Sequence, residues 1–146
     1  MAKARPAAGF TLIELVIALA IVAIVTSLAA SSYRGHLRRG HRAEAVHALL
    51  AAAAEQEKFH LANGRYGDRL DAAAGDDPPG LPVSSRTPGG HYALAVPAAT
   101  AAEYLLVATA AGSGGDPSCS SLSIDESGRR SATDARGADS TARCWQ

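Results

Sequence analysis

A single carboxylate interrupts a long apolar run near the start of the chain. From Phe10 to Ala30 the sequence has 21 residues, and Glu14 is the only one with a charged side chain. A helix of this length would span about 31 Å at ~1.5 Å per residue, which is close to the hydrocarbon thickness of a bilayer. Because a charged side chain in such a helix is costly, we expect Glu14 to have a dedicated partner.

The best available partner for Glu14 is an N-terminal amine. Cleavage of the chain after Gly9 would create this amine on Phe10, where it could pair with Glu14 of a neighbouring subunit. The apolar run is therefore predicted to be a stem helix that assembles with other stems once the first nine residues are removed.

An ordinary secretory signal is the alternative interpretation. Its charged region would be Lys3 and Arg5, and its cleavage site would be the small residues at positions 27–29. Secretory signals have apolar cores of about 7 to 15 residues. The greater length of this run, together with Glu14, favours the stem.

The start of the chain resembles the N-terminus of the type IV pilin superfamily. The resemblance rests on a short basic leader and the segment GFTLIEL at residues 9–15, followed by the apolar stem. It implies that a membrane-embedded prepilin peptidase cuts after Gly9 and methylates the amine of Phe10, while Glu14 serves filament assembly. It further implies a leader at residues 1–9, a transmembrane and assembly stem at 10–30, and a periplasmic, then extracellular, globular domain at 31–146.

A second periodic segment follows the stem without a proline to stop the helix. Apolar side chains recur there at three- and four-residue steps, as in an amphipathic helix with one face on a core. They are Ala43, Val46, Leu50 and Ala53. We predict one helix from about Thr11 to Leu61, ended by Asn63 and Gly64, which tolerate the left-handed conformation.

The rest of the chain predicts a loop and a small antiparallel sheet. Four prolines between residues 68 and 90 indicate a surface loop. Strand-like alternation follows at residues 92–96 and 104–109 and at Leu122 and Ile124, before a turn at Ser127 and Gly128. The predicted fold is α+β, with the amphipathic half of the long helix packed on the sheet.

Cys119 and Cys144 are the only cysteines, and one disulfide is the simplest interpretation. Such a bridge would remove unfolded-state entropy worth ~3.5 kcal/mol, which matters for a domain with little aromatic mass. It implies an oxidising compartment such as the periplasm. The order of elements is similar to that of PilE-like minor pilins, in which the region between two late cysteines lies on the outer surface of the filament.

A group of arginines follows the stem, at Arg34, Arg38, Arg39 and Arg42. The positive-inside rule alone would place them in the cytoplasm, but cleavage requires the leader to be there, and we follow the leader motif. Contact with lipid phosphates or with acidic groups on neighbouring subunits is the favoured interpretation. DNA is the alternative partner, because Arg129, Arg130, Arg136 and Arg143 add positive charge late in the chain. No aromatic residues are interleaved with the first group.

Other motifs do not predict a metal, a cofactor or catalysis. The histidines, at His36, His41, His47, His60 and His91, include no pair three or four residues apart. The acidic pairs at residues 76–77 and 125–126 lack the pattern of an EF-hand, and calcium is suggested only by a resemblance to some pseudopilins. The sequence contains no GxSxG nucleophile motif and no phosphate-binding glycine loop.

We therefore predict a structural subunit of a type IV pilus, most specifically a minor pilin. It would wait in a bacterial inner membrane with its N-terminus in the cytoplasm, and then enter an extracellular filament used in adhesion, twitching or DNA uptake. Its partners would be the prepilin peptidase, the pilus assembly platform and other pilin subunits. The alternatives are a type II secretion pseudopilin and, from another class, a monomeric membrane-anchored or secreted binding module.

Processing gives the first prediction. Mass spectrometry of the mature protein should show a chain that begins at N-methylated Phe10, because the motif places a cleavable glycine directly before a stem helix. A start after Ala29 would instead identify a secretory signal, and a retained Met1 would also contradict the pilin interpretation.

Overall fold

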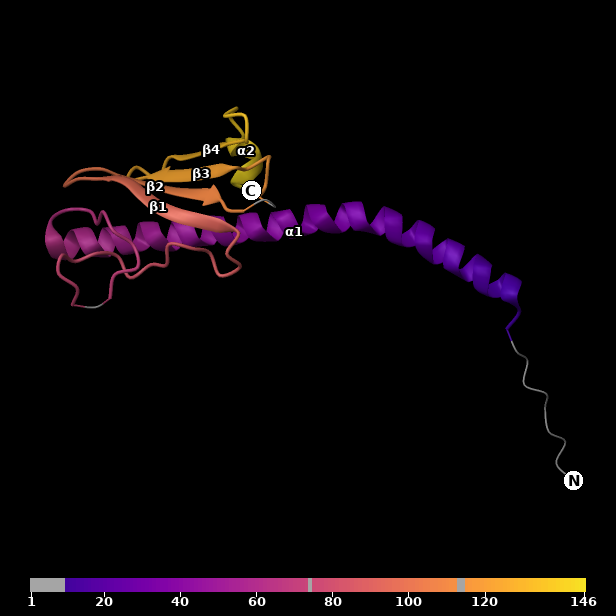
Figure 1. The fold of residues 1–146 in the computed structure, drawn as a ribbon. Coiled ribbons are helices and arrows are strands. Elements are labelled where there is room, and N and C mark those ends of the chain that lie inside the picture. The colour runs from indigo at the N-terminus through magenta and orange to yellow at the C-terminus, as the bar shows by residue number, and fades with distance from the viewer. Residues whose placement is uncertain (1–9, 74, 113–114) are drawn as a thin grey trace, which may run out of the picture. The chain divides into compact units, whose positions relative to one another are not determined.

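The computed structural model describes residues 10–73, 75–112 and 115–146, without the side chains of residues 28–32. Within it the chain forms two compact units, Met1–Leu37 and Arg38–Gln146. The helix α1, Leu12–Asn63, contributes residues to both units (Figure 1). The elements that follow it all belong to the second unit.

Both ends of α1 have local stabilising contacts. At its start, the side-chain oxygen of Thr11 accepts a hydrogen bond from the Glu14 N–H at 3.3 Å, as expected of an N-cap. At its end, Gly64 adopts a φ of 68° and donates its N–H to the His60 carbonyl at 2.8 Å. The predicted long helix is confirmed, and it ends two residues later than predicted.

The first unit exposes the large aliphatic side chains of α1. Leu12, Leu15 and Ile17 are each more than half exposed. Among the described residues, no helix reaches the length and apolar character that crossing a bilayer requires. The transmembrane assignment of residues 10–30 stays a prediction.

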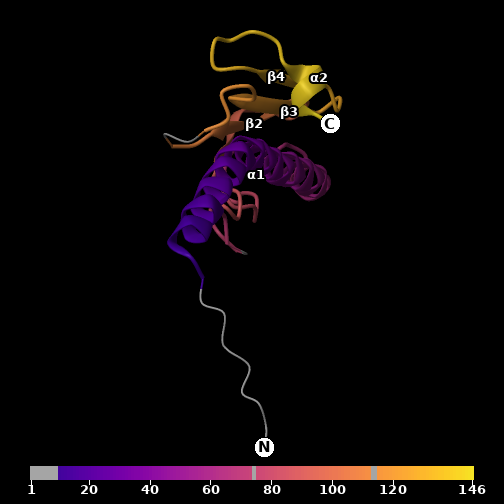
Figure 2. The same ribbon diagram turned by 90° about the vertical axis from the view of Figure 1, so that its right-hand side faces the viewer.

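The second unit contains a four-stranded antiparallel sheet over one side of α1 (Figures 1 and 2). Its strands follow in chain order: β1, Tyr92–Ala99; β2, Tyr104–Ala110; β3, Ser121–Asp125; and β4, Arg130–Thr133. A short helix, α2, Thr141–Cys144, comes last. The predicted sheet is confirmed, but the sequence analysis missed β4 and α2.

The core lies between the sheet and α1. Leu94, Leu106 and Leu122 are buried on the inner face of the sheet and belong to the same apolar cluster as Leu49 of α1. Alternate strand residues point to this core, as the period of two requires.

The predicted inner face of α1 is only partly right, since Val46 and Ala53 pack at the margin of the core. The buried residues of the helix are Ala45, Leu49, Ala52 and Gln56, whereas Ala43 and Leu50 are exposed. The buried face is therefore rotated by about one residue, roughly 100° around the helix. Alanines occur on every side of this segment, so periodicity could not fix its orientation, and the polar Gln56 completes the buried face.

The two outer edges of the sheet are covered by loop and terminal segments. Along β1, the Thr87 N–H donates to the Tyr92 carbonyl, and the Leu94 N–H donates to the Ser85 carbonyl. Along β4, the Ser140 N–H is donated to the Ala132 carbonyl. These bonds occupy edge groups that would otherwise be open to another strand. The predicted loop at 68–90 is confirmed, since its described residues form neither helix nor strand.

A buried glutamine ties α1 to the chain beyond its end. The Gln56 side-chain amide donates to the Gly67 carbonyl at 2.7 Å and accepts the Gly67 N–H at 2.8 Å. Both residues are buried, so this pair satisfies polar groups that have no access to water.

Substitution of this glutamine tests its contribution to stability. Gln56→Leu should lower the free energy of unfolding in urea by about 2 to 4 kcal/mol, because it leaves the Gly67 N–H and carbonyl buried without partners. Ala54→Leu, at an exposed position on the same helix, is the control and should change little. If the urea midpoint of Gln56→Leu equals that of the wild type, water satisfies the Gly67 N–H and carbonyl without loss of stability, which contradicts this account.

Candidate functional site

The C-terminal region is held together by a disulfide between Cys119 and Cys144. Their Cα atoms are 5.8 Å apart, and both residues are fully buried. The bridge joins α2 to the segment that precedes β3, which confirms the predicted pairing. The Tyr92 hydroxyl donates to the Cys119 carbonyl at 2.8 Å. Burial raises the pKa of Tyr92 to about 12, and the Asp116 carboxylate adds to this rise while Arg42 opposes it.

An ion pair connects the same region to α1. The Arg42 guanidinium lies 2.6 Å from an Asp116 carboxylate oxygen, with 15% of the Arg42 side chain and 4% of the Asp116 side chain exposed. Asp116 also accepts the Ser118 N–H at 3.0 Å. A second guanidinium nitrogen of Arg42 donates to the Arg143 carbonyl in α2 at 3.0 Å. One side chain therefore holds α1, the turn before β3, and α2 together.

This ion pair separates Arg42 from the other arginines of its group. The sequence analysis placed Arg42 among the candidate phosphate contacts, but the structure commits its guanidinium to internal partners. Arg38 and Arg39 are exposed on α1. Arg34 is exposed in the first unit.

An aromatic residue lies against one of the late arginines. The Arg130 guanidinium sits 5.2 Å from the centre of the Trp145 ring, within the range of a cation–π interaction. The Trp145 indole N–H donates to the Ser131 carbonyl at 2.9 Å, which fixes the ring beside β4. The sequence analysis missed this pair because its members lie far apart in the chain and only the packing of α2 on β4 brings them together.

Contacts connect these arginines across three elements. The Arg130 guanidinium of β4 lies over the Trp145 ring, two residues after Arg143 of α2. The backbone carbonyl of Arg143 accepts a hydrogen bond from Arg42 of α1. Arg38 lies one helical turn before Arg42. We call the three exposed members, Arg38, Arg143 and Arg130, the arginine line.

The carboxylates near this line close tight turns. Asp125 accepts the N–H groups of Ser127 and Arg129, and hydrogen bonding, chiefly from the Ser127 side chain, lowers its pKa. Asp134 accepts the N–H groups of Ala138 and Arg136, and these bonds lower its pKa. Both carboxylates therefore stay ionised at neutral pH and shape the loops that carry the arginines. Arg129 itself is exposed and 3.9 Å from Asp125.

The predicted assembly residues all belong to the first unit. Gly9 is outside the described residues, and Phe10 is exposed. Glu14 lies in the first turn of α1, where a negative charge is favoured by the helix dipole. Within the described part of the chain, Glu14 forms no salt bridge with another side chain. Its proposed partner belongs to another subunit, so this role stays a prediction.

Comparison with known families now adds to these observations. A family model described as type IV minor pilin ComP, DNA uptake sequence receptor, matches residues 31–123, which is more than half of the chain. The chain belongs to this family. A second model, the prokaryotic N-terminal methylation motif, matches residues 4–30. No curated protein matches the chain.

The family fits what the structure shows. A long helix packed on a four-stranded antiparallel sheet, with a C-terminal disulfide, is the type IV pilin fold. The chain is a type IV minor pilin, and the family is one of structural subunits. The methylation motif implies a membrane-anchored protein that is later exposed on a pilus. The match favours the minor pilin over both alternatives, the pseudopilin and the monomeric binding module.

The disulfide should account for much of this minor pilin's stability. The double variant Cys119→Ser/Cys144→Ser should lose about 3 kcal/mol of unfolding free energy in urea, because a loop of this length then gains freedom in the unfolded chain. Free thiols in the protein isolated from filaments, or a double variant as stable as the oxidised protein, would contradict this account.

Proposed function

We propose that this minor pilin receives DNA on the arginine line. The observation that carries the proposal is the placement of Arg130 against Trp145, in contact with the segment that carries Arg143. Exposed guanidinium groups bind phosphates through charge and hydrogen bonds. The printed description of the matching family, a DNA uptake sequence receptor, supports the same partner.

The geometry supports DNA over the lipid phosphates favoured from sequence alone. Lipid contact needs positive charge close to the stem, whereas Arg143 and Arg130 belong to α2 and β4, far along the chain from the stem. An extended series of cations suits a polymer of phosphates. Trp145 adds the aromatic surface that was absent from the first arginine group, and Arg stacked on an aromatic ring is held in position before DNA arrives. The role is binding within a filament, without a catalytic step.

DNA binding by arginine variants tests this proposal. Fluorescence anisotropy with the purified protein and duplex DNA should give weaker binding for Arg38→Ala/Arg130→Ala. The slope of log affinity against log salt should fall by about two, because two phosphate contacts are lost. Sequence-specific and random duplexes should lose similar affinity if these contacts are only to phosphates.

Matched arginines elsewhere provide the control. Arg65 and Arg69 are exposed and paired with Asp68 and Asp76, away from the disulfide. Arg65→Ala/Arg69→Ala should keep wild-type affinity and salt slope. An equal loss of DNA affinity in both double variants would show general charge attraction instead of a site. If neither variant loses DNA affinity, the arginine line is not the DNA site.

We also propose how the subunit reaches the filament. The leader at residues 1–9 would lie in the cytoplasm while the stem at 10–30 resides in the bacterial inner membrane. The prepilin peptidase would cut after Gly9 and methylate Phe10, and the assembly platform would then move the subunit into a pilus of other pilins. The methylation motif at residues 4–30 supports these steps. Glu14 would pair with the Phe10 amine of a neighbour.

Glu14 variants test the assembly step. Glu14→Val should be cleaved normally but enter sheared filaments less, because the neighbour's Phe10 ammonium would be buried without a counter-charge at a cost of ~3 to 5 kcal/mol. Glu14→Asp, which keeps the charge, should enter filaments better than Glu14→Val. If a processed Glu14→Val protein enters sheared filaments at the wild-type level, the Glu14 carboxylate is not needed for assembly.

A further inference from the structure

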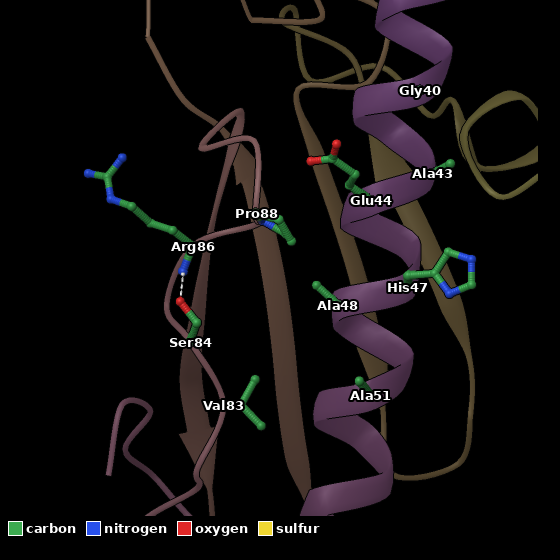
Figure 3. Close-up of a pocket in the computed structure, with 10 residues that line it drawn as sticks. All are labelled: Gly40, Ala43, Glu44, His47, Ala48, Ala51, Val83, Ser84, Arg86 and Pro88. Carbon is green, nitrogen blue, oxygen red and sulfur yellow. Dashed lines mark hydrogen bonds between the residues drawn. The ribbon is translucent and has the colours of Figure 1, made fainter. Parts of the chain in front are cut away.

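An open groove separates α1 from the loop that precedes β1. It has a volume of about 550 Å³ and lies between residues 40–51 of the helix and residues 83–88 of the loop (Figure 3). Small side chains such as Ala48 and Ala51 form the helix wall, and Val83 and Pro88 belong to the loop wall. The loop is hydrogen-bonded to β1 through Thr87 and Ser85.

Two polar contacts join the loop to α1 beside this groove. Glu44 is directed from the helix toward the loop (Figure 3) and accepts the Gly89 N–H at 3.1 Å. One helical turn earlier, His41 stacks on His91, with ring centres 3.4 Å apart and ring planes 16° from parallel. We call these contacts together the histidine latch.

Gly89 lies close to two side chains of the latch. A Cβ atom added to Gly89 would lie 2.8 Å from a Glu44 carboxylate oxygen and 2.8 Å from His91 Cδ2. Both atoms belong to side chains, so a residue larger than glycine would displace the Glu44 carboxylate or the His91 ring from its place in the latch. The loop backbone, Glu44 and His91 therefore meet at one point.

We propose that the histidine latch is a pH-sensitive switch that holds the loop against α1 and releases it on acidification. Two neutral imidazoles, or one neutral and one protonated, can stack face to face. Two imidazolium rings at this separation repel each other, because like charges so close interact strongly. Histidine is the side chain that ordinarily changes charge between pH 5 and 8.

The surrounding charges favour release once both rings are protonated. On α1, Arg38 and Arg42 flank His41, although Arg42 is paired with Asp116. Arg86 lies on the loop, and His47 lines the groove from α1. Glu44 is the acid at the latch and can compensate one imidazolium. From the strand side, the Ala111 N–H is donated to the His91 carbonyl. Among the described residues neither ring forms a salt bridge, so a second imidazolium would have no carboxylate partner of its own there.

Hydrogen–deuterium exchange of the full-length protein tests the switch. Exchange in residues 85–92 would be measured at pH 8 and pH 5 and corrected for the intrinsic effect of pH. Protection should fall severalfold at pH 5, because two charged rings at this separation repel each other. In His91→Phe, which keeps a flat ring without a charge, protection should be similar at both pH values. Gly89→Ala should show low protection at both.

A second stacked histidine gives the control. His60 stacks on Tyr66, with ring centres 4.5 Å apart, at the other end of the helical segment in this unit. His60→Phe should keep the pH response in residues 85–92. The proposal is overturned if wild-type protection does not change with pH, or if His91→Phe shows the same fall as the wild type.

Discussion

The ion pair between Arg42 and Asp116 is the contact on which the C-terminal half of the globular unit depends. Asp116 is almost fully buried, and its partner is attached to α1 at a distance of 74 residues in sequence. If either charge were removed, the other would remain buried without compensation. The same guanidinium binds the Arg143 carbonyl, so α1, the turn before β3, and α2 all depend on its position.

The disulfide and the ion pair act on the same region in different ways. The disulfide limits the unfolded chain and fixes α2 to the segment before β3. The ion pair fixes that covalently closed region to α1. With α2 in place, Trp145 can pack beside β4 and hold Arg130. The position of the proposed DNA contacts is therefore a consequence of one buried pair and one bridge.

The features that the sequence predicted depend on local pattern. The continuous apolar and alanine-rich run determines α1, and alternation at residues 92–96 and 104–109 determines β1 and β2. β4 could not be found in this way, since its four residues, RSAT, have no alternation and obtain their partners from β3 and the C-terminal segment. The buried face of α1 could not be predicted from the sequence either, because alanine fits both a buried and an exposed position. Gln56 is accommodated in the interior through its hydrogen bonds to Gly67.

The candidate site shows the same limit. Four arginines at residues 34–42 look alike in sequence, yet the structure pairs Arg42 with a carboxylate and leaves Arg38 exposed. The nearness of Trp145 to Arg130 arises from the packing of α2 against β4, which no spacing in the sequence encodes. The charge of the sequence suggests DNA as a partner, but the tertiary contacts decide which arginine side chains are available to bind it.

A double-mutant cycle on Arg42 and Asp116 tests the central claim most directly. The unfolding free energies of Arg42→Ala, Asp116→Ala and the double variant would be compared with that of the wild type. The account predicts that the double variant is destabilised by less than the sum of the single variants, with a coupling of more than about 1 kcal/mol. A coupling near zero would show that the two charges do not hold this region together.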